Sequence, residues 1–190
     1  MKVDPLPAGL GLSGADAPAA AVSALGRAQQ GAVEAFAALI RAHQSAVYTL
    51  ALRLLGSREE AQELAQDVFL QLHASLARIE SETHLRFWLR RTVSHRAIDR
   101  LRRRRERRAP AVPEELAAAQ GGDPLLERRL RELVAGLPAT ARAVLLLRYQ
   151  EDLDPTDIAL ALELPLNTVK SHLKRSLALL RRRCELDGLE

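Results

Sequence analysis

The sequence predicts an all-helical protein made of two small helical domains joined by a flexible linker. The 190 residues are 47% apolar but only 3% aromatic, and they are rich in Ala, Leu and Arg, which have high helix propensities. Apolar residues recur at helical spacing along most of the chain. Two segments rich in Pro and Gly interrupt this pattern. Each predicted domain is near the lower size limit for a stable hydrophobic core.

The N-terminal segment, residues 1–28, is expected to form a flexible leader. Residues such as Pro5 and Gly9 neither continue a helix nor supply a hydrophobic core. From Val33 onward the apolar residues repeat with a helical period, and this run stops at Gly56. Glycine is common just past the C-terminus of a helix. We therefore expect a helix between these two residues.

The next helix is expected to begin after Ser57, whose side chain can form a capping box with Glu60. Its polar face carries Glu63, Gln66 and Asp67, which share one side of the helix because they are three and four positions apart. In a basic protein such a patch is either solvated surface or a docking site for a basic groove of another protein. The spacing alone favours solvated surface.

A loop at Ser81 to His84 is expected to precede a third long helix, which starts near Leu85 and contains Trp88. This helix runs into an arginine block, residues 100–108, with seven arginines in nine positions. Such a run suits contact with phosphates, although a solvated surface accounts for it as well. Trp88 could belong to the hydrophobic core or stack on unpaired bases beside the basic helix.

A linker is expected over residues 109–124, which contain Pro110 and Gly121 and are mildly acidic. It divides a first domain, residues 29–108, from a second domain, residues 125–190. The 16 residues of the linker can stretch over at most about 50 Å. The two domains could therefore contact sites that lie far apart.

The second domain contains a helix-turn-helix pattern. An amphipathic helix is expected over 125–137 and another over 141–149, before Asp154 caps a short helix and a last helix runs from Asn167 to Arg183. Two short consecutive helices with a shared apolar core can present the second one to a DNA major groove. An ordinary helical hairpin with a solvated basic face is the alternative. The outward residues of the second helix are polar or basic: Asn167, Thr168, Lys170, Ser171, Lys174 and Arg175.

The sequence indicates neither catalysis nor a bound cofactor or metal. No Ser/His/Asp arrangement, phosphate-binding loop or metal-ligand cluster occurs, and the five histidines are scattered. The single cysteine, Cys184, is expected to be a free thiol in a reducing cytoplasm. No export signal and no stretch of 18 apolar residues is present, so membrane insertion is not expected. The net charge of +4 is modest, but its clustering suits a polyanionic partner.

Three parts of the sequence, taken in order, resemble the extracytoplasmic-function (group IV) sigma factors of bacterial RNA polymerase, over about residues 25–183. Residues 61–69 (AQELAQDVF) look like the helix of that family that binds the polymerase clamp. Trp88 and residues 96–102 (RAIDRLR) look like the helix that reads the minus-ten promoter element. Leu137-Pro138, VLLLRY at 144–149 and TVKS at 168–171 look like the region that reads the minus-thirty-five element.

The resemblance implies a non-enzymatic transcription initiation factor with core RNA polymerase and promoter DNA as partners. An anti-sigma factor is a further candidate partner. The resemblance assigns polymerase binding to Glu63, Gln66 and Asp67, which reverses the preference for plain surface there. Minus-ten recognition and melting are assigned to His84, Trp88, Arg91, His95, Arg96, Asp99, Arg100, Arg102 and Arg103. Minus-thirty-five recognition is assigned to Asn167, Thr168, Lys170, Ser171, Lys174 and Arg175.

The sequence departs from the family pattern at a few positions. His95 stands where Asn is usual, and Val93 and Ser94 replace Ala and Arg. Glu163 replaces a glycine that normally closes the helix-turn-helix, and Asn167 replaces another common glycine. If the backbone keeps a left-handed conformation at Glu163, the side chain costs about 1 kcal/mol.

Two other functions remain open. A helix-turn-helix regulator that does not join the polymerase would account for residues 125–183, but it would leave the polar face around Gln66 and the arginine block unused. A helical adaptor that binds only proteins would treat the arginines as solubilising surface.

Overall fold

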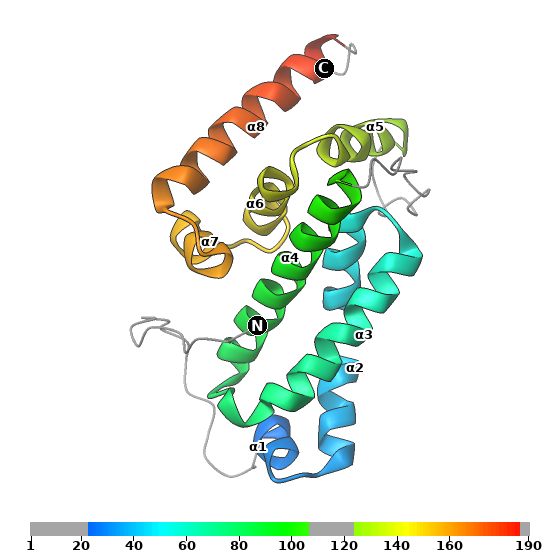
Figure 1. Cartoon of the computed structure of the whole chain (residues 1–190), viewed down its shortest axis with the longest axis vertical. Coiled ribbons are helices and arrows are strands. Elements are labelled where there is room, and N and C mark those ends of the chain that lie inside the picture. The colour runs from blue at the N-terminus through cyan, green and yellow to red at the C-terminus, as the bar shows by residue number, and fades with distance from the viewer. Residues whose placement is uncertain (1–22, 107–123, 187–190) are drawn as a thin grey trace.

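The structure, a computed structural model, describes residues 23–106 and 124–186. These residues form helices joined by short turns and contain no strand, which confirms the predicted all-helical class. None of the described helices is long and apolar enough to cross a membrane. The elements are α1 (Ala24–Gln29), α2 (Val33–Leu55), α3 (Arg58–Ser75), the 3₁₀ turn η1 (Leu76–Arg78), α4 (Glu82–Glu106), α5 (Pro124–Ala135), α6 (Ala139–Tyr149), α7 (Pro155–Leu162) and α8 (Leu166–Leu186) (Figure 1).

The last residues of the predicted flexible leader form a helix, α1, so the prediction is corrected there. Ser23 caps this helix, and its residues Leu25 and Ala28 are buried against α2. The Gln29 side chain donates hydrogen bonds to the carbonyl oxygens of Leu76 (3.0 Å) and Ile79 (2.7 Å). These contacts join residues about fifty positions apart, so the local Pro and Gly content could not reveal them. The rest of the expected leader, residues 1–22, lies outside the described residues.

Helices α2, α3 and α4 form a bundle whose ends follow local signals. Gly56 is left-handed, with φ 73°, and ends α2 as expected. Ser57 caps α3 by accepting a hydrogen bond from the backbone N–H of Glu60 at 3.3 Å. The expected loop before α4 is shorter than predicted, because Ser81 accepts a hydrogen bond from the N–H of His84 and the helix already begins at Glu82. The side chains that fill the bundle completely include Leu54, Leu64, Leu72, Leu85 and Val93.

Helices α5 to α8 form the second unit, and α7 and α8 make the helix-turn-helix that the sequence predicts. Asp154 caps α7 by accepting hydrogen bonds from the N–H groups of Asp157 (3.0 Å) and Thr156 (2.6 Å). These bonds favour the carboxylate, chiefly the one from Asp157, and hold the pKa of Asp154 below its ordinary value. Glu163 closes α7 in the left-handed conformation, with φ 54° and ψ 42°. The strained backbone anticipated at this position is therefore present.

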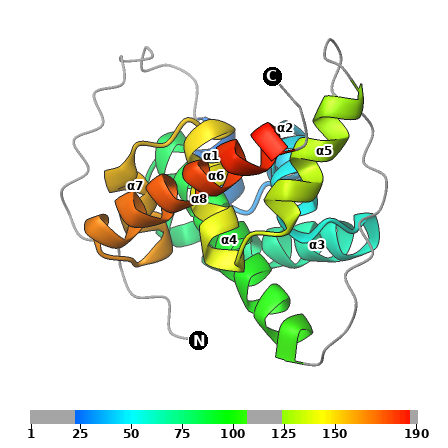
Figure 2. The ribbon, with the colours of Figure 1, turned by 90° about the horizontal axis from the view of Figure 1, so that it is seen from above.

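The two helical units pack against each other. Helices α6 and α7 lie beside α4, and α6 also contacts α2 (Figure 1, Figure 2). One hydrophobic cluster runs through both units, from Leu50 and Leu54 of α2 to Val144 and Leu147 of α6. Most of the expected linker, residues 109–123, lies outside the described residues. The candidate functional residues therefore lie on two units that share a packed interface.

Candidate polymerase and nucleic-acid interfaces

The acidic face of α3 and the basic face of α4 lie against each other. Arg100 of α4 is placed between two carboxylates of α3, with its guanidinium 3.3 Å from Glu63 and 2.9 Å from Asp67. Arg96 reaches the same Asp67 carboxylate at 3.3 Å. Arg104 approaches Glu60 at 3.6 Å one turn further along. The structure thus brings together residues for which two separate functions, polymerase binding and DNA binding, are predicted.

Further hydrogen bonds hold the side chains of Arg96 and Arg100, both in α4, against α3. The guanidinium of Arg96 donates to the side-chain oxygen of Gln71 from two nitrogens, at 2.9 and 2.7 Å. Arg100 also donates to the backbone carbonyl of Glu60 at 3.2 Å. Both arginines are only partly exposed, at 35% and 26% of their side-chain surface. In this arrangement they orient α3 against α4 and are not free to contact phosphates.

An exposed surface remains on α3 beside these pairs. Gln66 is exposed and lines a groove of about 470 Å³ between α2 and α3, together with Tyr48 and Phe69. Leu70 follows Gln66 by four positions and is 64% exposed. A large apolar side chain so open to water, next to exposed polar groups, is typical of a protein contact surface. Leu70 is not among the residues predicted from the sequence, although its spacing from Glu63 and Gln66 places it on the same helix face.

Trp88 belongs to the hydrophobic core, which corrects its assignment as a DNA-binding residue. Its side chain is only 6% exposed and lies in the central cluster of the bundle, so it does not present a ring for stacking on a base. Val93 and Ser94, two of the departures from the family pattern, are fully buried in α4 as well. This face of α4 therefore supports the fold.

The other predicted minus-ten residues are distributed around α4. Asp99, Arg102 and Arg103 are exposed toward its C-terminal end, and Arg102 donates a long hydrogen bond of 3.4 Å to the Thr140 hydroxyl. His84 is half-buried at the N-terminal end, where its ring nitrogen accepts a hydrogen bond from the Glu80 N–H at 3.3 Å. The structure does not gather the nine residues into one open surface.

Arg91 and His95 face the second helical unit. His95 lies with its Nε2 atom 2.9 Å from the carbonyl oxygen of Ala161 in α7, and it donates a hydrogen bond when that nitrogen carries the proton. Arg91 forms an ion pair with Glu163. Both side chains are partly covered by α7. The two departures noted at His95 and Glu163 therefore occur in the same contact region.

The outward face of α8 is open, as the sequence predicts. Val169 is fully buried and fixes the rotation of the helix, so that the polar positions around it point away from the hydrophobic core. Thr168 is half-buried, and the other five predicted residues are exposed: Asn167, Lys170, Ser171, Lys174 and Arg175. Within the described parts of the chain, the three cations among them have no ion-pair partner.

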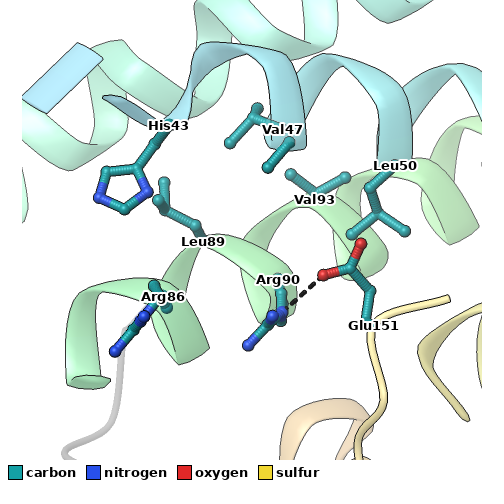
Figure 3. Close-up of a pocket in the computed structure, with 9 residues that line it drawn as sticks. His43, Val47, Leu50, Arg86, Leu89, Arg90, Val93 and Glu151 are labelled. Atoms are coloured by element: carbon teal, nitrogen blue, oxygen red, sulfur yellow. Dashed lines mark hydrogen bonds and ion pairs between the residues drawn. The ribbon is translucent and has the colours of Figure 1, made fainter. Parts of the chain in front are cut away.

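No cluster of three or more His, Cys, Asp or Glu side chains that could hold a metal ion occurs within residues 23–106 and 124–186. The small hollow in Figure 3 has a cavity volume of about 80 Å³ and is mostly apolar. It is lined by Val47 and Leu50 of α2, by Leu89 and Val93 of α4, and by Glu151. The hollow lies mainly between α2 and α4, and Glu151 is its one lining residue from the second unit.

Comparison with known proteins identifies both helical units. Residues 39–107 match the family described as Sigma-70 region 2, and residues 127–180 match Sigma-70, region 4. The RNA polymerase sigma-E factor of Streptomyces coelicolor is 30% identical over 156 residues, which cover 80% of this chain and 86% of that protein. The ECF RNA polymerase sigma factor SigW of Bacillus subtilis is 24% identical, covering 81% of this chain and 91% of that protein.

The chain spans only 60% of another relative, the ECF RNA polymerase sigma factor SigE of Mycolicibacterium smegmatis, to which it is 30% identical over 155 residues. Two solved structures share the fold. The sigma factor RpoE of Bartonella quintana, in complex with the anti-sigma factor NepR, has a TM-score of 0.67 at 20% identity and covers 82% of this chain and 99% of that chain. CnrH in complex with the cytosolic domain of CnrY has a TM-score of 0.65 at 21% identity. The match covers 86% of this chain and 96% of that chain. The chain belongs to the extracytoplasmic-function family of RNA polymerase sigma factors.

Proposed function

We propose that this sigma factor binds core RNA polymerase, recognises the minus-ten and minus-thirty-five elements of promoters and starts transcription from them. Residues 29–108 would form the domain for polymerase and minus-ten contacts. Residues 109–124 would be the linker, and residues 125–190 the minus-thirty-five domain. The observation that carries the proposal is the exposed basic face of α8 in a helix-turn-helix, on a chain that also has an open polar and apolar surface on α3.

The contact with polymerase is proposed for the surface of α3. Glu63, Gln66 and Leu70 are exposed on neighbouring turns, and Gln66 opens into the groove between α2 and α3. Leu70 can supply the apolar centre of an interface, and the polar neighbours can fix its orientation. Asp67 contributes less directly, because Arg96 and Arg100 already share its carboxylate.

The minus-thirty-five contact is proposed for the N-terminal half of α8. The first residues of a recognition helix reach base edges in the major groove, whereas basic residues further along contact phosphates. Asn167, Lys170 and Ser171 occupy the first positions and are exposed, and Lys174 and Arg175 follow one turn later. We assign base contacts to the first three and phosphate contacts to the last two.

The minus-ten contact is proposed for α4. Its predicted residues fall into two groups, one exposed to solvent and one in contact with other helices. Asp99, Arg102 and Arg103 are exposed and can meet DNA directly. Arg91 and His95 contact α7, and Arg96 and Arg100 contact α3, so these four must change partners before they can bind DNA. The ion pairs themselves oppose this exchange only weakly, because partly exposed pairs contribute about 0–1 kcal/mol each.

We further propose that the protein acts in the cytoplasm, without catalytic chemistry of its own. An anti-sigma factor is a proposed additional partner, since the Bartonella quintana sigma factor of the same fold was solved with one. A regulator that works without polymerase, and a helical adaptor for proteins, are the competing functions.

The test uses a library of duplexes that are randomised at both promoter elements, with core RNA polymerase. Sequencing of the transcripts should show two enriched sequence blocks when the full chain and the polymerase are both present. Enrichment of bound DNA that is the same with and without polymerase would favour the regulator. No enrichment under either condition would favour the adaptor.

A further inference from the structure

Asn167 lies in the first turn of α8, and its side chain is exposed. Val169, two positions later, is fully buried in the hydrophobic core and fixes the rotation of the helix. With about 100° of rotation per residue, Asn167 and Ser171 each lie about 20° from the direction opposite Val169. These two residues therefore occupy the middle of the outward face of α8, and Lys174 and Arg175 lie on its two flanks.

The carboxamide of Asn167 forms no hydrogen bond with any residue that the structure describes. It does not cap α8, because the Pro165 carbonyl oxygen already accepts from the N–H groups of Thr168 at 2.8 Å and Val169 at 3.2 Å. A capping side chain belongs to the residue just before a helix. That residue is Pro165, and Asn167 lies inside the first turn.

Helix stability does not account for the asparagine at position 167 either. Asn is a poorer helix former than Ala, Leu or Arg, because its side chain competes for backbone hydrogen bonds. The position instead presents a free donor and a free acceptor side by side, on the face proposed to enter the major groove. Asn167 is also one of the departures from the family pattern, so what it contacts is a property of this chain.

Adenine is the base whose major-groove edge matches both groups of a carboxamide. It presents the acceptor N7 beside the N6 amino donor, whereas guanine presents two acceptors. Thymine presents an acceptor beside a methyl group, and cytosine presents a single amino donor. We infer that Asn167 is a specificity-determining residue that reads an adenine in the minus-thirty-five element, donating to N7 and accepting from the N6 amino group.

The spacing along α8 restricts where this adenine lies. Lys170 follows Asn167 by three residues, a separation of about 4.5 Å along the helix axis. Base pairs in duplex DNA are about 3.4 Å apart. The adenine should therefore lie within about two base pairs of the base that Lys170 contacts.

This inference rests on the proposed function, because it names the base that α8 reads within the proposed minus-thirty-five contact. The target is a promoter duplex selected with the full-length chain and core polymerase. Each base pair of its minus-thirty-five element is replaced in turn, and fluorescence anisotropy measures the affinity of the polymerase complex. The proteins compared are wild type, Asn167→Ala, Asn167→Asp and the control Lys174→Ala, which changes a proposed phosphate contact on the same face.

For the wild type, replacing one A·T pair should reduce affinity about 5- to 150-fold, which corresponds to about 1–3 kcal/mol. Asn167→Ala should abolish the preference at that pair and keep the preferences at other pairs. Asn167→Asp should favour cytosine there, because a carboxylate accepts from the cytosine amino group. Lys174→Ala should weaken binding to all duplexes alike and keep the adenine preference. Melting temperatures should match wild type, because both positions are exposed.

A change of one atom in the DNA tests the hydrogen bond to N7 directly. In 7-deazaadenine a carbon replaces N7, and pairing with thymine is kept. Placed at the preferred position, this base should weaken binding of the wild type several-fold, because the acceptor for the Asn167 amide is lost. It should not change the affinity of Asn167→Ala, which has no amide to donate.

An adenine preference that survives in Asn167→Ala would overturn the inference. Equal effects of 7-deazaadenine on wild type and on Asn167→Ala would do the same. If wild type and polymerase select a minus-thirty-five block in either case, the proposed function stands and only the reading by Asn167 fails. Selection of no such block would count against the proposed function itself.

Discussion

The basic surfaces of α4 and α8 have similar composition but differ in what surrounds them. On α4, Arg96 and Arg100 pair with carboxylates of α3, and Arg91 pairs with Glu163. On α8, Lys170 and Lys174 are exposed and have no ion-pair partner within the described residues. The difference shows that the number of positive charges in a segment does not determine how many can reach DNA. The packing of neighbouring helices decides this.

The physical origin of the difference is the position of each helix. Helix α4 packs against α2, α3 and the second unit along most of its length, and its exposed residues lie mainly toward its C-terminal end. Helix α8 buries one stripe, which includes Val169 and Ser176, and leaves its other faces to solvent. A central helix therefore uses its arginines for structure first, whereas a peripheral helix keeps them available.

The largest effect is expected for Trp88→Ala, and it should be a loss of stability. Removing a large buried aromatic side chain should lower the free energy of unfolding by about 3–5 kcal/mol. Chemical denaturation monitored by circular dichroism measures this change. Trp88→Phe should recover much of the stability because it refills most of the volume. A stability close to wild type for the alanine variant, together with loss of DNA binding, would return Trp88 to a stacking role.

A substitution on the exposed face of α8 should lower DNA affinity and leave stability unchanged, which is the reverse of the result expected for Trp88→Ala. Lys170→Ala should reduce affinity for the preferred minus-thirty-five sequence by about 1–3 kcal/mol, since a specific hydrogen bond to a base edge is removed. Stability should not change because the side chain is exposed. The comparison is with Arg181→Ala, a variant at an exposed basic position farther along the same helix. Equal losses of affinity on preferred and scrambled duplexes would assign Lys170 to phosphates.

Asp67→Asn should release the paired arginines of α4. The carboxylate contacts Arg96 and Arg100, and all three side chains are partly exposed, so the loss of stability should be at most about 1 kcal/mol. Non-specific DNA affinity at low salt should rise, because two guanidinium groups become available. The control Glu59→Gln removes an exposed charge from the same helix without breaking these pairs. Indistinguishable DNA affinities for the two variants would contradict this expectation.

The exposed end of α4 should give the smallest effect. Replacing Arg102 and Arg103 with alanine should weaken binding nearly uniformly across sequences. It should also flatten the slope of log affinity against log salt by about 0.9 for each phosphate that these side chains neutralise. A salt titration with two unrelated duplexes measures both quantities. An unchanged slope would mean that these side chains do not bind phosphates.

Local signals in the sequence predicted the features that depend on a few adjacent residues. Gly56 ends α2, Ser57 caps α3, and Asp154 caps α7, because each of these depends on a single backbone conformation or side chain. The exposure of Lys170 and its neighbours followed from helical periodicity around Val169.

Features that depend on distant contacts were not predictable in this way. Helix α1 is held by Gln29 through bonds to residues about fifty positions away. The burial of Trp88, and the pairing of Asp67 with Arg96 and Arg100, depend on how α3 and α4 pack. Spacing along one helix shows which residues share a face, but it does not show what that face meets.

The central claim is that this chain joins core RNA polymerase through the exposed surface of α3. The most direct test is co-purification of core polymerase with the full-length variant Gln66→Ala and Leu70→Ser. Both side chains are exposed, so helicity and melting temperature should remain at wild-type values. Assembly with the polymerase should be abolished, because a central apolar side chain and its polar neighbour are removed together. Co-purification at wild-type yield would contradict the assigned interface.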